Sequence, residues 1–83
     1  MTDKINELRA EIDIIDKELV ELFNRRFAAC IVIGEEKKKT DAVVFDPTRE
    51  QKIVTRLTAF AEHPGMIDAL WPHIMAYSRS LQN

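Results

Sequence analysis

The sequence has 83 residues and a mass of 9.6 kDa, so we expect a single domain over residues 1–83. Hydrophobic residues make up 46% and charged residues 31%, a composition typical of a globular chain and not of a disordered one. Twelve Lys and Arg against 14 Asp and Glu give a net charge of −2. That balance argues against a general nucleic-acid binder, because such proteins carry a basic excess.

Cysteine usage and hydropathy exclude other classes. Cys30 is the single cysteine, which excludes an internal disulfide framework and a Cys-based zinc site. No apolar run approaches the roughly 18 residues that a membrane span requires, and the first residues lack the apolar core of a signal peptide. We therefore expect a cytoplasmic protein in a reducing compartment, with no membrane partner.

The first segment predicts a helix from about residue 3 to about residue 39. With two Gly and three Pro in the chain, turns are few, which favours a small number of long helices. Apolar residues recur here at alternating intervals of three and four, which indicates one helical stripe: Ile5, Leu8, Ile12, Ile15, Leu19, Leu22, Ala29 and Ile33. Gly34 weakens the helix by about 1 kcal/mol relative to Ala. An alternative is that the helix ends at Gly34.

Two shorter helices follow a loop over residues 40–45. Asp46 and Pro47 form a helix start, and the second helix ends at His63-Pro64-Gly65. We expect its apolar face to be Ile53, Leu57, Phe60 and Ala61. The third helix is expected over about residues 66–81, with an apolar face of Ile67, Leu70, Trp71, Ile74 and Leu81. Pro72 interrupts this pattern, so the helix either begins near Trp71 or is kinked.

The predicted lengths point to a second chain. A helix of about 37 residues is about 55 Å long, whereas a compact domain of this size has a radius of gyration of only about 12 Å. The apolar stripe of the first helix therefore extends beyond anything that one chain can wrap around it. We expect an all-α homodimer, and dimerisation by itself says nothing about chemistry.

Arg26 and Lys37 are the first polar residues that this simple architecture leaves unexplained. Arg26 occupies a stripe position between Leu22 and Ala29, where an apolar residue is expected. Lys37 follows 11 residues later, within about 20° of the same helix side. Their long side chains can reach toward a common point. The alternatives are a cation that sets dimer register and a solvated lysine run.

Two further polar groups follow. Asp46, Arg49 and Glu50 share one face at the start of the second helix, where they could equally be a cap followed by surface charges. Ser78 and Gln82 continue the apolar stripe of the third helix, where the alternative is a frayed helix end.

Arg9 completes the set of candidate ligands. It lies 17 residues before Arg26, about 25 Å along a continuous helix, so both reach one small ligand only if a partner chain supplies one of them. Together these side chains predict a pocket for a small dicarboxylate, because arginine forks match carboxylates. No nucleophile with its base and no glycine-rich phosphate loop is visible, and His63 and His73 without a carboxylate cluster are weak metal ligands. We expect no metal and no cofactor.

These residues resemble a known family. The pattern consists of Leu8-Arg9, Ile12, Asp16, Leu19, Arg25-Arg26, Gly34, Lys37, Asp46-x-x-Arg49-Glu50 and Ser78-x-x-x-Gln82. Over essentially the whole chain it resembles the all-α class of chorismate mutases. The resemblance implies an intertwined homodimeric helical bundle with two active sites, each lined by both chains. It also implies that Arg9 from the partner, Arg26 and Arg49 hold the two substrate carboxylates, with Ser78 assisting.

The remaining implied roles concern the reaction itself. The resemblance implies that Lys37 and Gln82 donate to the ether oxygen of the breaking C–O bond, and that Asp46 and Glu50 orient the ring hydroxyl and the cations. Conversion of chorismate to prephenate is a unimolecular [3,3] rearrangement. It requires a bound substrate conformation and stabilisation of growing negative charge, with no nucleophile, general base or cofactor.

Two other functions remain open at this point. An isochorismate pyruvate-lyase shares the fold and much of the site, although the acidic pair Asp46 and Glu50 favours the mutase. The second alternative is a non-catalytic helical dimerisation module, which would not explain why a charged residue, Arg26, occupies a position in the apolar stripe.

Overall fold

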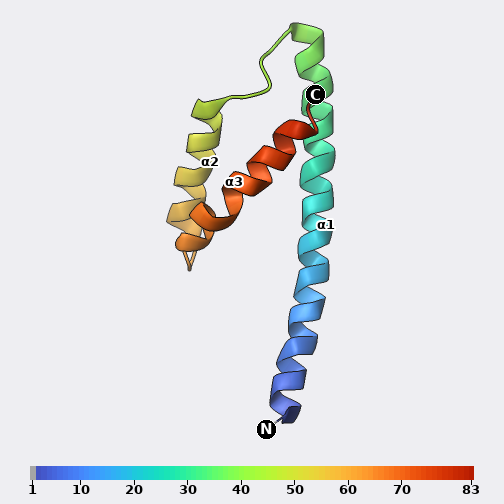
Figure 1. Ribbon diagram of the computed structural model, residues 1–83, viewed down its shortest axis with the longest axis vertical. Coiled ribbons are helices and arrows are strands. Elements are labelled where there is room, and N and C mark those ends of the chain that lie inside the picture. The colour runs from blue at the N-terminus through green and yellow to red at the C-terminus, as the bar shows by residue number, and fades with distance from the viewer. Residues whose placement is uncertain (1) are drawn as a thin grey trace.

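Three helices make up the structure, a computed structural model that describes residues 2–83. They are α1 (Thr2–Thr40), α2 (Pro47–Phe60) and α3 (Gly65–Ser80), and no strand occurs in these residues. The all-α prediction is confirmed. Figure 1 shows α2 and α3 beside the C-terminal half of α1, while the N-terminal half extends away from both. No helix in the described part of the chain combines the length and the apolar composition that a membrane crossing requires.

The first helix continues through Gly34, so the alternative of a helix ending there is wrong. Asp3 in the first turn and three lysines in the last turn place favourable charges at the two ends of the helix dipole. The helix ends at Thr40, and the next residue, Asp41, has a φ of 57°, in the left-handed region that Asp tolerates better than most residues. The Ala42 N–H then donates to the Lys37 carbonyl at 2.9 Å. The loop that follows this turn leads to the start of α2 (Figure 1).

The second helix begins as expected from its capping residues. The Asp46 carboxylate accepts a hydrogen bond from the Arg49 N–H at 2.9 Å, and Pro47 occupies the first turn. Ile53 and Leu57 are half-buried. Phe60, expected on the same apolar face, is the last residue of α2 and is 86% exposed, so it does not share the partial burial of the other two. Ala61 lies just beyond the helix, as its C-cap residue.

The third helix begins at Gly65 and contains Pro72, so the alternative of a start near Trp71 is wrong. A proline at this position has no N–H to donate to the carbonyl of Asp68, four residues earlier. Ile67 is almost fully buried, and Met75, which the predicted apolar face omitted, is buried as well. The helix is thus held by packing in spite of an unfavourable residue in its interior.

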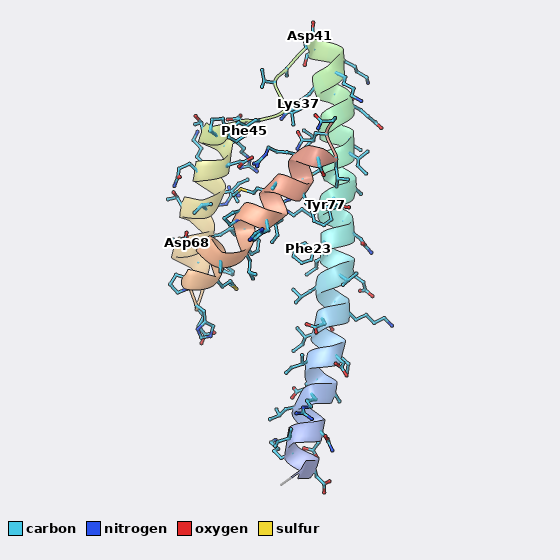
Figure 2. The ribbon with its side chains drawn as sticks, in the orientation of Figure 1. Phe23, Lys37, Asp41, Phe45, Asp68 and Tyr77 are labelled. Carbon is cyan, nitrogen blue, oxygen red and sulfur yellow. The ribbon has the colours of Figure 1, made fainter. Side chains whose placement is uncertain are left out.

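Aromatic contacts join α3 to α1. The Tyr77 ring meets the Phe27 ring edge to face with centroids 4.9 Å apart, and Phe27 stacks on Phe23 at 5.7 Å. Figure 2 shows Phe23 and Tyr77 between the two helices. Phe23 and Phe27 were not part of the predicted stripe, so α1 has a second apolar strip for its own chain. Cys30 is buried nearby on α1.

The predicted stripe itself remains uncovered. Among the described residues, the buried hydrophobic side chains are Cys30, Ile67 and Met75. Five stripe residues of the N-terminal half of α1 are between 45% and 54% exposed: Ile5, Leu8, Ile12, Ile15 and Leu19. The molecule measures 58 × 24 × 16 Å, so α1 accounts for its whole length. One chain therefore leaves most of the α1 stripe without a packing partner.

The positions of Pro72 and Pro47 in their helices predict that replacing them by alanine has opposite effects on stability. Pro72→Ala should raise the free energy of unfolding by roughly 1–2 kcal/mol. The alanine N–H restores a backbone hydrogen bond inside α3, and because residue 72 is exposed, the substitution removes little packing. Pro47→Ala is the matched control and should lower it by about 0.5 kcal/mol, because proline suits a first helical turn. Urea unfolding at one fixed protein concentration measures both. Equal destabilisation by the two variants would contradict this account of α3.

Candidate functional site

A cavity of about 260 Å³ lies between the C-terminal half of α1, the first turns of α2 and the end of α3. Its wall is apolar at five positions, Cys30, Ile33, Val44, Ile53 and Met75. Its polar lining consists of Arg26, Lys37, Asp46, Arg49, Glu50, Ser78, Arg79 and Gln82. Charged and amide groups from all three helices and the final turn thus converge on one small volume.

Seven of the eight residues that the sequence singled out line this cavity, and Arg9 does not. Arg9 is exposed on the N-terminal half of α1, about 25 Å along the helix from Arg26. Arg26 and Lys37, 11 residues apart, both line the same wall as their common helix side predicted. The cavity of one chain therefore lacks the Arg9 side chain.

Arg26 is fixed by a contact with α3. Its guanidinium Nη1 donates to Ser78 Oγ, and the Ser78 hydroxyl in turn donates to the Ile74 carbonyl at 2.7 Å. Ser78 is only 5% exposed. Because a guanidinium has five N–H donors, this contact orients Arg26 and leaves further donors for a ligand.

Lys37 connects the loop and the last residues to α1. Its ammonium donates to the Val44 carbonyl at 2.9 Å and to Gln82 Oε1 at 3.0 Å. Gln82 is 9% exposed, so the alternative of a frayed end is wrong for this residue. With Oε1 accepting from Lys37, the amide NH₂ of Gln82 keeps both of its donors for an acceptor in the cavity.

Asp46 and Arg49 reach the cavity from the start of α2. The Asp46 carboxylate caps the helix through the Arg49 N–H, so the capping role that was an alternative for Asp46 is real. Both residues also line the cavity. Cap geometry therefore fixes the place where the exposed Arg49 side chain leaves the helix.

Arg79 is the site residue that sequence reasoning missed. Its Nη1 lies 2.6 Å and 2.5 Å from the two carboxylate oxygens of Glu50, and its guanidinium carbon is 4.9 Å from the centre of the Phe45 ring. A signal existed, because Arg79 lies between Ser78 and Gln82, three residues before the latter on the same side. The residue joins α3 to α2 across the cavity.

The cavity carries a positive charge excess. Its four cationic side chains face two anionic ones, a formal excess of two positive charges. Since Glu50 is already paired with Arg79, the cations left for a ligand are Arg26, Lys37 and Arg49. Among the residues that the structure describes, no group of three His, Cys, Asp or Glu is placed to hold a metal ion. The arrangement suits a small dianion that also offers a hydrogen-bond acceptor to Gln82.

Comparison with known proteins gives a consistent family. A family model described as chorismate mutase type II matches residues 8–83. The chain is 38% identical over 55 residues to the bifunctional chorismate mutase/prephenate dehydratase of Aquifex aeolicus, an alignment covering 66% of this chain and 15% of that protein. It is 30% identical over 64 residues to the T-protein of Haemophilus influenzae, covering 77% and 17% respectively. The chain thus spans less than a fifth of the length of these curated relatives. No solved structure matches it significantly.

The Glu50–Arg79 pair should stabilise the fold measurably. The two side chains are 21% and 33% exposed, so the pair is partly shielded from water. A double-mutant cycle with Glu50→Gln and Arg79→Met should give a coupling energy of about 1 kcal/mol. The exposed pair Glu36–Lys39, at 63% and 69%, is the matched control and should give a few tenths of a kcal/mol at most, by the usual behaviour of surface pairs. Equal coupling energies would contradict a structural role for Arg79.

Proposed function

The chain belongs to the chorismate mutase type II family, and from this we propose that it catalyses the rearrangement of chorismate to prephenate in aromatic amino-acid biosynthesis. The observation that carries the proposal is the convergence of Arg26, Lys37, Arg49 and the Gln82 amide on one cavity. Chorismate is a dianion with an ether oxygen, which matches the charge excess and the free amide donors. The enzyme is an isomerase that acts in the cytoplasm.

Two arginines of the cavity account for part of the substrate binding. In this proposal Arg26 and Arg49 each bind a carboxylate, and Ser78 keeps the Arg26 guanidinium in place through its hydrogen bond. Holding both carboxylates bends the flexible enolpyruvyl side chain over the ring, so that the carbons that will bond lie close together. The rate gain from this restriction comes from positioning, with no chemical group of the protein reacting.

Lys37 and Gln82 supply the electrostatic part of the catalysis. As the C–O bond breaks, negative charge grows on the ether oxygen, and donors fixed in advance stabilise that charge. Lys37 carries a positive charge, and its hydrogen bond to Gln82 Oε1 turns the amide donors toward the ligand. Asp46 and Glu50 orient the ring hydroxyl and the cations, with Glu50 held by Arg79.

A second copy of the chain completes each site in this proposal. The uncovered stripe of α1 supports a dimer in which the long helices pack against each other. Arg9 lies on that stripe's half of α1, away from the cavity of its own chain, so the partner's Arg9 is the one that joins the site. An intertwined homodimer thus explains the exposed apolar side chains and the distant arginine together.

The direct test is an assay of the purified chain with two substrates. We expect chorismate absorbance to fall while prephenate appears, and no salicylate fluorescence from isochorismate. Salicylate formation alone would identify the pyruvate-lyase instead. If a folded dimer converts neither substrate, the proposed reaction is refuted and the chain is a non-catalytic dimerisation module.

The shared site predicts complementation between two inactive variants. Arg9→Ala and Arg26→Ala should each abolish turnover, with sedimentation still giving a mass near twice 9.6 kDa. When equal amounts are unfolded and refolded together, half of the dimers are mixed and each has one intact site, so about a quarter of wild-type activity should return. If the two arginines act from the same chain, the refolded mixture stays as inactive as the separate variants.

Gln82→Glu should make kcat depend on pH, with faster turnover in acid. A neutral carboxyl can donate to the ether oxygen, whereas a carboxylate repels the growing charge. Free glutamic acid ionises near pH 4.3, so we expect kcat of the variant to rise as the pH falls toward about 4, against a much flatter wild-type profile. Circular dichroism at each pH controls for unfolding. Identical profiles would show that Gln82 does not act on the substrate.

A further inference from the structure

Gly34 lies within the last two turns of α1 and is buried beneath the last residues of the chain. A Cβ atom built on Gly34 would be 2.5 Å from the Cα of Gln82 and 2.7 Å from its carbonyl oxygen. Both distances are far shorter than an ordinary van der Waals contact. The main chain of Gln82 therefore occupies the space that a side chain at position 34 would need.

We propose that Gly34 is a positioning residue for Gln82. Because Gly34 has no side chain, the main chain of Gln82 packs directly against α1, and this contact, which we call the seat of Gln82, sets how closely the Gln82 amide approaches the cavity. This inference rests on the proposed function, because it treats the Gln82 amide as a donor to the substrate. Gly34 is not among the residues that line the cavity, so it acts only through Gln82.

Two contacts with the same face of α1 determine where Gln82 lies. Its main chain rests on Gly34, and its side-chain oxygen accepts from Lys37 one helical turn further on. The turn that carries it is closed by its own hydrogen bonds, from the Gln82 N–H to the Arg79 carbonyl at 3.0 Å and from the Leu81 N–H to the Tyr77 carbonyl at 3.3 Å. A seat for the main chain and a partner for the side chain together restrict the amide to one place.

A methyl group at position 34 has no way to avoid this contact. The blocking atoms belong to the Gln82 backbone, so no side-chain rotation relieves the overlap, and the turn has to move by about 1 Å to reach an ordinary contact. The α1 helix itself gains from alanine, because glycine is the poorer helix former. The substitution thus displaces the amide while it favours the helix on which Arg26 and Lys37 stand.

The test is Gly34→Ala, with Gly65→Ala as the matched control. A Cβ on Gly65 meets no atom within 4 Å, so that variant makes the same chemical change without displacing anything. For Gly34→Ala we expect kcat to fall 10- to 100-fold, since a displacement of about 1 Å can cost that much, while KM changes less than threefold. For Gly65→Ala we expect both constants to stay within twofold of the wild type. Helicity and sedimentation should remain those of the wild type in both.

Repeating the Gly34→Ala substitution in a Gln82→Ala chain separates the loss of Gln82 positioning from a general disturbance of the structure. In the Gln82→Ala chain the displaced amide is already missing, so adding Gly34→Ala should lower kcat by less than twofold. If the two losses multiply, Gly34 acts through something other than Gln82 and the inference is wrong. A Gly34→Ala chain that loses helicity or the dimer would likewise overturn it, because the residue would then be needed for folding.

Hydrogen exchange tests the seat without any assay of activity. The Gln82 N–H should exchange at least 10-fold faster in Gly34→Ala than in the wild type and in Gly65→Ala, because the turn leaves its seat. Unchanged exchange and an unchanged side-chain amide resonance of Gln82 would overturn the inference even in an active enzyme. Conversely, a wild type without mutase activity refutes the proposed function, while faster exchange in Gly34→Ala would still establish the seat.

Discussion

The apolar stripe of α1 is the constraint on which the rest of the structure depends. A 39-residue helix presents this stripe along most of a 58 Å molecule, while α2 and α3 lie only beside the C-terminal half of that helix and leave the stripe residues exposed. The few side chains that one chain buries, such as Ile67 and Met75, form too small a core to offset the entropy of ordering 83 residues. Folding and association are therefore expected to occur together. The same geometry keeps Arg9 far from the cavity of its own chain.

The polar groups of the cavity hold one another in place. Ser78 holds Arg26, Lys37 holds the Gln82 amide, and Arg79 holds Glu50. Each of these contacts crosses between elements that are distant in sequence, and in the first two the orienting bond leaves further donors free on the oriented group. An arrangement of this kind suits a reaction in which the protein contributes geometry and fixed charge. It also makes the site sensitive to small shifts of the backbone, as the close contact between Gly34 and Gln82 indicates.

Charge balance within the cavity depends on Arg79. Without it, Glu50 and Asp46 would offset two of the three remaining cations. With Arg79 paired to Glu50 and lying over the Phe45 ring, the lining keeps an excess of two positive charges. The pair also ties α2 to α3 within the lining of the cavity. Arg79 thus contributes both to the mutual placement of these helices and to the field that a dianion experiences.

Local patterns in the sequence predicted the three helices and most of the polar residues that line the cavity. The Asp46-Pro47 start of α2 and the stripe of α1 depend on residues within one or two turns of each other, so they can be read from spacing alone. The spacing from Arg26 to Lys37 on one helix likewise predicted their common direction. The sequence did not determine that Arg79 would pair with Glu50, that Phe27 would meet Tyr77, or that the Gln82 backbone would rest on Gly34. Those contacts join residues 29 to 50 positions apart, and they exist only because packing brings α3 and the turn after it against α1 and α2.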